Sequence, residues 1–469
     1  MKFERILRSA DTLAIVFLAA WPLVFYWQIA LGQKVFSGDD ITSFFFPFRV
    51  ELSRALAEGR LPLWTMYLES GFPIFAEGQI AALDPLNLIL HTLLPVSLAF
   101  SYSILLRLAM TSIGMYLFCR SAGLRATSAF LAGFVFGFGG FMLAHIQHLT
   151  LEAVAAWLPW LLYFQNQMQR AWREGRRSAV VWFCLVTLTI GIQFVSGFPQ
   201  IAIANLIPFG LISILGVAFW NRAENANPRA TTRAVFRSLG ITVLSVGIGV
   251  GIAAVQLLPS AELLNLSVRA QDAGPEFFSS YSMNPAMLTQ FISPFWQLGK
   301  PDVPNMEYWG YLGILPILLM PFAARRRDGR TRFFILLAMG ALILMLGKYL
   351  PVYDLLYYLP FFNRFRVPAR FILLFSFAVL YLAAVGFEEL QDRMRDSAKP
   401  SRWAFLVGCP FAFLVVGIIG TQDRVASELW MIVWAWLPAL LFLLAVGAIG
   451  FACFRGERRV FVTLCTGLV

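Results

Sequence analysis

Charged residues are scarce in this chain of 469 residues, because only 13% of them are Asp, Glu, Lys or Arg. Soluble domains carry about a quarter of such residues, so the composition excludes an ordinary soluble domain. Hydrophobic residues make up 59% of the sequence, and the mean hydropathy is +0.71. The apolar runs are long and uniform, whereas the strands of a membrane barrel alternate. The sequence therefore predicts an all-α, polytopic integral membrane protein, since each crossing helix needs roughly 20 apolar residues.

Other familiar signatures are missing too. The five cysteines are scattered in or beside apolar runs and form no close pair, so they suggest neither a disulfide framework nor a zinc site. The sequence shows neither a phosphate-binding loop nor a Ser-His-Asp pattern, and "GFGGF" lies within an apolar run without the third glycine of a dinucleotide fingerprint. A nucleotide-sugar donor is therefore not expected. The pI of 9.7 follows from basic membrane-flanking loops and gives no reason to expect a nucleic-acid partner.

Twelve apolar runs are candidates for membrane helices, and a thirteenth could begin at Val460. Only ten residues remain from that point, so the C-terminus could be truncated. We treat residues 1–469 as a single membrane domain. The predicted spans are 12–31, 96–118, 127–144, 151–168, 178–196, 199–220, 236–258, 308–323, 331–347, 370–387, 403–420 and 429–450.

Lys and Arg concentrate at the N-terminus and in alternate loops, such as "RAWREGRR" and "RRRDGRTR". Cytoplasmic loops carry such an excess, so the pattern predicts a cytoplasmic N-terminus. The run at 12–31 is longer than a signal peptide and has no clear small-residue cleavage site, so it is interpreted as a retained span. The long loops, at 32–95 and 259–307, then lie outside, and loops of that size are usually functional.

The first outer loop begins with the acidic pair Asp39 and Asp40, directly followed by aromatic residues. Apolar residues then recur at helical spacing, which predicts a juxtamembrane helix at about 42–58 in the membrane interface. A second apolar stretch, "LNLILHTLLP", is too short to span and would be re-entrant or interfacial.

Several stretches between about 36 and 390 resemble the YfhO-like family of bacterial membrane proteins, within the GT-C superfamily of glycosyltransferases. They are "SGDDITSFFFPFR", "LPLWTMYLESGFPIFAEGQIAALDPLN", "HIQHLTLEAVAAWLPWL", "SGFPQIA", "EYWGYLGILPILL" and "RFRVPARFILLFSFAVLYLAAVGFEEL". The resemblance implies a GT-C-like fold and a sugar taken from a polyprenyl-phosphate carrier. It places the chain in the bacterial cytoplasmic (inner) membrane, with membrane lipids and a cell-envelope acceptor as partners. Family members are usually longer than this chain.

Asp39 and Asp40 are the predicted catalytic residues. One carboxylate would act as general base toward the acceptor hydroxyl. The other would orient the acceptor or bind a divalent cation such as Mg or Mn, because hard cations prefer carboxylate oxygens. Alternatively, Asp39 caps the helix that follows, since Asp is favoured at that position. The residues alone do not decide which aspartate is the base or whether a metal is needed.

Basic residues of the outer loops and one within a span are predicted to bind the donor phosphate, since guanidinium groups bind phosphate bidentately. The alternatives are contact with anionic lipid headgroups for the loop residues, and snorkelling or pairing with a loop acid for the residue inside the span. The predicted set is Arg364, Arg366, Arg370, Lys348 and Arg107.

A further set of polar residues is predicted to line an acceptor cavity. The "HIQHLTLE" stretch places two histidines and a glutamate within two helical turns, which could also bind a metal or be a plain polar turn. The three remaining acids could equally be solvated loop residues. The set is His145, His148, Glu152, Glu77, Asp84 and Glu307.

Two other functions are compatible with the sequence. A transporter or flippase of lipid-linked intermediates would also need many spans and an intramembrane Arg. Transporters often contain internal repeats and midplane sites, whereas this sequence shows no clear repeat between its halves and its acids gather in the outer loops. A non-catalytic membrane scaffold is the third alternative.

Overall fold

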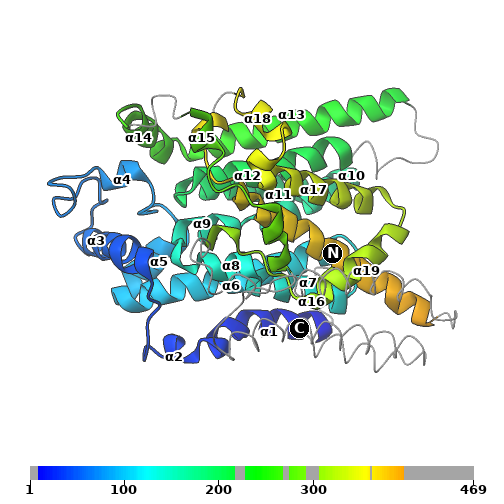
Figure 1. The fold of residues 1–469 in the computed structure, drawn as a ribbon, viewed down its shortest axis with the longest axis horizontal. Helices are drawn as coiled ribbons and strands as arrows, with labels where there is room; N and C mark the ends of the chain where they lie inside the picture. Colours follow the sequence, from blue (N-terminus) through cyan, green and yellow to red (C-terminus); the bar gives the residue numbers. More distant parts are fainter. Residues whose placement is uncertain (1–8, 217–227, 268–273, 292–305, 360–361, 396–469) are drawn as a thin grey trace. The chain divides into compact units, whose positions relative to one another are not determined.

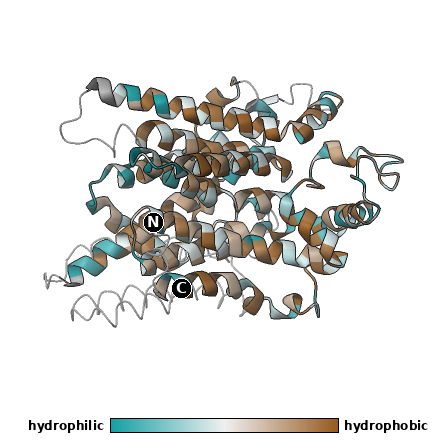
Figure 2. Ribbon diagram, turned by 180° about the vertical axis from the view of Figure 1, so that it is seen from behind, coloured by the Kyte–Doolittle hydropathy of each residue, from teal (hydrophilic) through white to brown (hydrophobic). Residues whose placement is uncertain are grey.

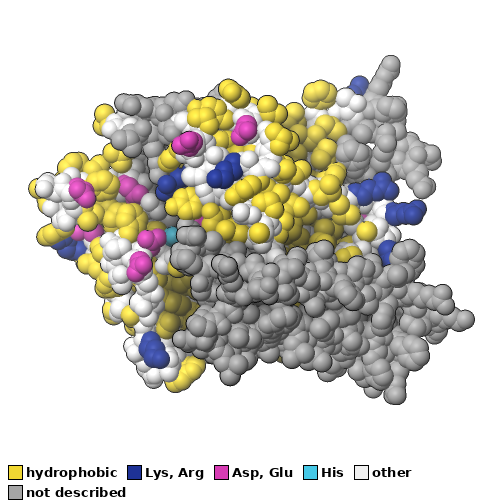
Figure 3. Space-filling model, viewed as in Figure 1, with side chains coloured by type: hydrophobic (Ala, Val, Ile, Leu, Met, Phe, Trp, Pro, Cys, Tyr) yellow, Lys and Arg dark blue, Asp and Glu magenta, His cyan; other side chains and the backbone are white. Residues whose placement is uncertain are grey.

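The computed structural model describes residues 9–216, 228–267, 274–291, 306–359 and 362–395. Its regular elements are helices, apart from an isolated antiparallel bridge between Thr65 and Phe72. The long helices are hydrophobic along most of their length (Figure 2), and hydrophobic side chains cover much of the described surface drawn in Figure 3. The predicted all-α membrane class is confirmed by six helical segments that are long and apolar enough to cross a membrane: Val96–Ser121, Ala126–Gln147, Ser178–Val195, Thr232–Ile252, Gly329–Tyr349 and Pro368–Arg393.

The predicted spans differ from the observed helices in several places. Predicted spans 403–420 and 429–450, and the segment from Val460, lie outside the described residues. Shorter apolar helices, Ala10–Phe25, Pro199–Leu215 and Ile314–Arg325, stand where longer spans were predicted.

The predicted span 151–168 is wrong, because the structure contains helix α9 (Leu149–Ala155) and a separate helix α10 (Leu158–Arg173) there. Pro159 stands in the first turn of α10 and explains the break. A proline cannot donate a backbone hydrogen bond, and its ring clashes with the carbonyl four residues earlier.

The described chain forms two compact units, which are treated separately below. The first contains Met1–Ala122, His145–Phe278 and Leu359–Arg366. Its helices, labelled in Figure 1, are α1 (Ser9–Phe25), α2 (Trp27–Ala30), α3 (Phe46–Ala57), α4 (Ile74–Glu77), α5 (Pro85–Leu93), α6 (Val96–Ser121), α9, α10, α11 (Ser178–Val195), α12 (Pro199–Leu215), α13 (Pro228–Ile252), α14 (Ala254–Asn265) and α15 (Gly274–Phe278).

Helix α3 follows a π-helical turn at Ile41–Phe45, within the range predicted for the juxtamembrane helix. Its apolar residues Phe48 and Leu52 are buried against Ile74 and Ile80 of the same loop. Full burial of such a side chain stabilises the fold by about 1.5–3 kcal/mol. The apolar face that predicted a membrane-surface helix is therefore covered by protein.

The loop at 32–95 touches the start of α12 at a pair of glycines. Gly197 has φ +92°, and a Cβ placed on it would lie 2.5 Å from the carbonyl oxygen of Gly78. An L side chain rarely adopts that backbone conformation, and the neighbouring backbone leaves no space for one. Glycine at 197 thus permits the close approach of the loop to the helix bundle.

We expect Gly197→Ala to destabilise the first unit by about 1–3 kcal/mol, because the new methyl group overlaps backbone atoms and the conformation is strained. Thermal unfolding of the detergent-solubilised protein measures the effect. Gly210→Ala is the matched control, since its Cβ meets nothing within 4 Å and Ala favours the helix over Gly. Equal unfolding midpoints for the two variants would contradict the assigned close approach.

The second unit contains Gly123–Ala144, Ser279–Tyr358 and the chain from Val367 onward. Its last described helix, α19 (Ile372–Arg395), is apolar on all sides over most of its length and almost entirely buried, as expected for a core helix. Helix α7 and the 3₁₀ helix Met320–Arg325 pack on it, as do α16 and α17. The helices of this unit are α7 (Ala126–Phe138), α8 (Gly140–Ala144), α16 (Ile314–Leu319), α17 (Gly329–Leu346), α18 (Val352–Leu356) and α19.

Candidate functional site

Asp40 forms an ion-pair contact with His148 in the first unit. Its Oδ2 lies 3.0 Å from His148 Nε2, and the two side chains are 51% and 20% exposed, respectively. Asp40 precedes the π-helical turn Ile41–Phe45, and its carboxylate makes no capping hydrogen bond there. This carboxylate therefore faces an imidazole and remains accessible from solvent, which is the arrangement that proton transfer to a bound group requires.

The backbone around Asp40 is held close to the turn that carries His148. A Cβ on Gly38 would lie 3.1 Å from the side-chain oxygen of Gln147, so glycine lets the two segments approach. The neighbouring Asp39 is exposed, and its carbonyl oxygen accepts hydrogen bonds from Ser43 Oγ at 2.5 Å and Thr42 Oγ1 at 3.2 Å. The structure thus distinguishes the two aspartates, because the Asp40 carboxylate is the one that contacts the His148 imidazole.

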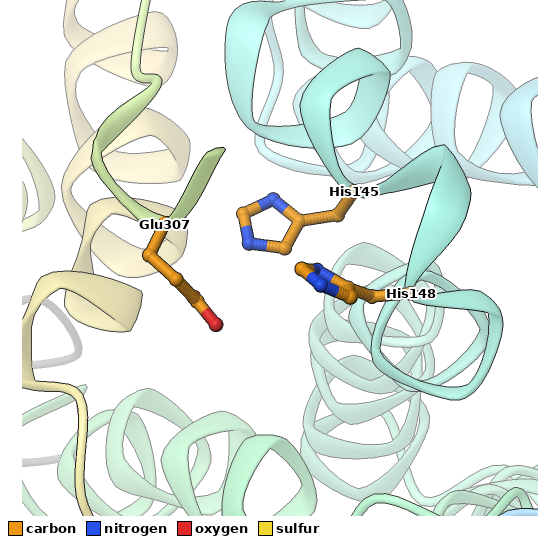
Figure 4. Close-up of side chains that lie close together, drawn as sticks. All are labelled: His145, His148 and Glu307. Atoms are coloured by element: carbon orange, nitrogen blue, oxygen red, sulfur yellow. The ribbon is translucent and has the colours of Figure 1, made fainter. Parts of the chain in front are cut away.

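His148 directly follows the 3₁₀ turn His145–Gln147 and stands at the N-cap position of α9. The imidazoles of His145 and His148 lie with ring centroids 5.2 Å apart (Figure 4), and His145 is fully buried. Glu307, which Figure 4 also labels, belongs to the second unit. The predicted histidine pair is therefore brought together beside Asp40.

Asp84 is a fully buried carboxylate in the loop at 32–95, directly before α5. It caps α5 by accepting hydrogen bonds from the backbone N–H groups of Leu86 at 3.0 Å and Asn87 at 3.1 Å. It also forms an ion pair with Arg107 of α6 and accepts a 2.5 Å hydrogen bond from Ser196 Oγ, just after α11. The interpretation of Asp84 as a solvated loop acid is wrong, and Arg107 pairs with a loop acid, as one of its predicted alternatives stated.

The protonation of Asp84 follows from these partners. Burial raises the pKa of a carboxyl group, but Arg107 and the hydrogen bonds from Ser196 and Asn87 outweigh it, so the pKa of Asp84 lies below its ordinary value. Asp84 is therefore charged whenever the fold is intact near neutral pH, and it balances the buried guanidinium of Arg107.

Arg49 of α3 is a second buried guanidinium, and sequence reasoning assigned it no role in the site. It is 2% exposed, and its Nη1 donates to the carbonyl oxygen of Ile80 and, at 3.4 Å, to that of Gln79. Burial lowers the pKa of Arg49 to about 10. A signal was present in the sequence, because Arg49 stands at helical spacing from Phe45 and Leu52, on the apolar face of α3.

Glu77 and Glu152 occupy different environments near this loop. The Glu77 carboxylate is half-buried and accepts hydrogen bonds from Gln79 N at 2.8 Å and Gln79 Nε2 at 2.7 Å. Glu152 of α9 is 1% exposed, and its Oε1 has no hydrogen-bond partner among the described residues. Of these two predicted cavity residues, only Glu77 is thus partly open to solvent.

The predicted donor-phosphate residues are divided between the two units. Arg364 and Arg366 are exposed in the first unit, where Arg366 lies over the ring of Phe277 at 5.5 Å. Arg370 belongs to the second unit, in which its Nε and Nη2 donate to Glu307 at 3.0 and 2.5 Å. A carboxylate thus occupies the bidentate edge of Arg370, and Glu307 is a buried ion-pair partner, so its interpretation as a solvated acid is wrong.

Lys348 also belongs to the second unit, where its backbone N–H donates to Ser282 Oγ at 3.0 Å. Its ammonium lies 5.7 Å from the ring centre of Tyr349. The Lys348 ammonium therefore lies near an aromatic ring. Its role as a phosphate ligand stays a prediction.

His91 of α5 provides a test by pH. Its ring is buried, its Nδ1 lies 2.8 Å from Ser53 Oγ, and burial together with nearby Arg49 lowers its pKa to about 3. The unfolded chain takes up this proton near pH 6.5, whereas the folded chain does so only near pH 3, so acid favours unfolding across that window. At about pH 4.5 the loss of unfolding free energy reaches up to about 2.7 kcal/mol, at 1.36 kcal/mol per pH unit.

We therefore expect the unfolding midpoint of wild type in detergent to fall between pH 7 and about pH 4.5 more steeply than that of His91→Leu. The leucine variant cannot take up the proton and keeps an apolar side chain in the same place. Parallel pH dependences for the two proteins would contradict a neutral, buried His91.

The long apolar helices and the buried ion pair define a helical integral membrane protein. Residues 13–469 match the family described as "Bacterial membrane protein YfhO", and the chain belongs to this family. No curated protein matches the sequence significantly. Among solved structures, ArnT from Cupriavidus metallidurans bound to undecaprenyl phosphate is similar over 97% of this chain and 75% of its own, with 15% identity and a TM-score of 0.44.

Proposed function

We propose that this protein is a glycosyltransferase that moves a sugar from a polyprenyl-phosphate carrier to an acceptor on the outer face of the bacterial cytoplasmic membrane. The observation that carries the proposal is the accessible Asp40 carboxylate held 3.0 Å from His148 Nε2. The membrane family and the GT-C resemblance of the quoted motifs support the substrate class. The outward orientation of this loop is part of the proposal.

In this proposal Asp40 is the general base. His148 donates its Nε2–H to Asp40 Oδ2 and leaves Oδ1 to accept the proton of the acceptor hydroxyl. The acceptor oxygen forms a bond to the anomeric carbon while the bond from that carbon to the phosphate oxygen breaks. The departing polyprenyl phosphate keeps the electron pair, and the single displacement inverts the anomeric carbon. Basic groups stabilise the developing phosphate charge, for which exposed Arg364 and Arg366 are the candidates.

The test uses purified protein in liposomes with a radiolabelled polyprenyl-phosphate sugar. We expect the label to move from the lipid phase to an added acceptor without ATP. Transfer is measured with and without EDTA. Loss of transfer in EDTA and its return with Mg or Mn would assign a divalent cation to the reaction. Wild-type protein that transfers no label to any acceptor tested would refute the proposal.

A transporter or flippase of lipid-linked intermediates is the second candidate. Buried Arg107 within α6 favours it, because charges within membrane helices often mark transport pathways. The same liposomes distinguish the two functions. Movement of intact labelled carrier between leaflets, without cleavage of its sugar, would support transport and contradict transfer.

A further inference from the structure

Segment 74–84, which contains α4 and ends directly before α5, is held on the helix bundle by several side-chain hydrogen bonds. Gln256 Nε2 of α14 donates to the carbonyl oxygen of Phe75 at 2.8 Å, and Ser260 Oγ donates to that of Ala76 at 2.7 Å. Arg49 holds the carbonyls of Gln79 and Ile80. Side chains of α3 and α14 therefore bind four backbone carbonyl groups of segment 74–84.

Asp84 connects segment 74–84 to α6 and to the end of α11. Its carboxylate is shared between Arg107 of α6 and Ser196 after α11, residues 23 and 112 positions away in the sequence. All three residues are at most 3% exposed, so solvent does not replace these bonds. Hydrogen bonds to charged groups stabilise a fold more than hydrogen bonds between neutral groups do.

The residues directly before α12 favour the contact with segment 74–84. "SGFP" occurs at 70–73 and again at 196–199, and the second copy supplies both Ser196 and Gly197. Gly197 admits the backbone of Gly78, while Ser196 reaches Asp84. Glu77 directly precedes Gly78, and its half-buried carboxylate accepts hydrogen bonds from the amide and the side chain of Gln79.

We propose that Asp84 is a positioning residue. Its buried carboxylate holds segment 74–84 on α6 and on the turn at Ser196, and it thereby fixes Glu77 as a carboxylate that hydrogen-bonds hydroxyl groups of a sugar or acceptor. Asp84 itself touches no substrate. The role of Glu77 rests on the proposed transferase function, whereas the fastening of the segment does not.

Hydrogen–deuterium exchange of the full chain in detergent tests the fastening. Ser196→Ala removes one bond to Asp84 but keeps the ion pair with Arg107, so the fold is retained. We expect amides of 74–84 to exchange about tenfold faster, since 1.4 kcal/mol corresponds to a factor of ten. Ser112→Ala is the matched control, because Ser112 is equally buried but bonds only within its own helix, to Leu108 O. We expect it to leave exchange in 74–84 unchanged.

Kinetics then test the positioning role. We expect Ser196→Ala to raise the KM for the acceptor several-fold while kcat changes little, because the Asp40 and His148 pair is untouched. Unchanged exchange in 74–84 would overturn the fastening. Faster exchange with unchanged KM would overturn the role assigned to Glu77. If Ser196→Ala exchanges faster but the wild-type protein transfers no sugar, the attachment of segment 74–84 is supported and only the transferase function is refuted.

Discussion

Asp40→Asn is expected to lower the rate of sugar transfer by about 10²–10⁴-fold, the range that a positioned general base contributes. The amide keeps the size of the side chain but cannot accept the proton of the acceptor hydroxyl. Asp40 is about half exposed, so the substitution should leave the unfolding free energy within about 0.5 kcal/mol of wild type. Initial rates with a labelled carrier, measured alongside thermal unfolding, separate lost chemistry from lost folding.

Asp39→Asn is the matched control, since it makes the same chemical change one residue earlier on an exposed side chain. We expect it to retain a rate near that of wild type. His148→Gln should be intermediate, because Asp40 stays but loses the imidazole. If Asp39→Asn and Asp40→Asn are equally active, or equally inactive, the assignment of Asp40 as the base is wrong.

Arg107→Met is expected to lower the unfolding free energy by about 3–5 kcal/mol. The substitution leaves the Asp84 carboxylate buried without its ion-pair partner, and an unpaired buried charge is strongly unfavourable. Chemical unfolding in mixed micelles measures the change. Removing both charges in Asp84→Asn/Arg107→Met should recover most of the loss, because two neutral groups need no compensation.

Arg170→Met provides the comparison for this prediction. Arg170 pairs with Glu174 at 3.1 Å, but its side chain is 63% exposed. Exposed ion pairs contribute about 0–1 kcal/mol. Similar losses for the Arg107 and Arg170 variants would show that the pair of Asp84 and Arg107 is not buried as described.

The fold class could be predicted because it depends on composition and run length, which the sequence displays directly. The position of α3 was also accessible, since Phe48 and Leu52 recur at helical spacing. The surface that covers the apolar face of α3 could not be predicted, because the same pattern fits a lipid surface and a protein surface equally well. Only the structure shows that Ile74 and Ile80 cover it.

The candidate site was predicted in its residue types but not in its pairings. The sequence analysis named Asp40, His148, Asp84 and Arg107. Their spacing in the sequence does not show which of these residues contact one another. Ser196 was missed for the same reason, since it reaches Asp84 across 112 positions. Contacts of that range are set by how helices pack, a property that a single sequence does not display.

The central place of α19 has a consequence for biosynthesis. Helix α7 emerges from the ribosome long before α19, and yet α19 is the helix on which it packs. Until α19 is translated, the surfaces of α7, α16 and α17 that it covers remain exposed. A stalled nascent chain that lacks α19 should consequently be recognised by membrane quality-control proteases.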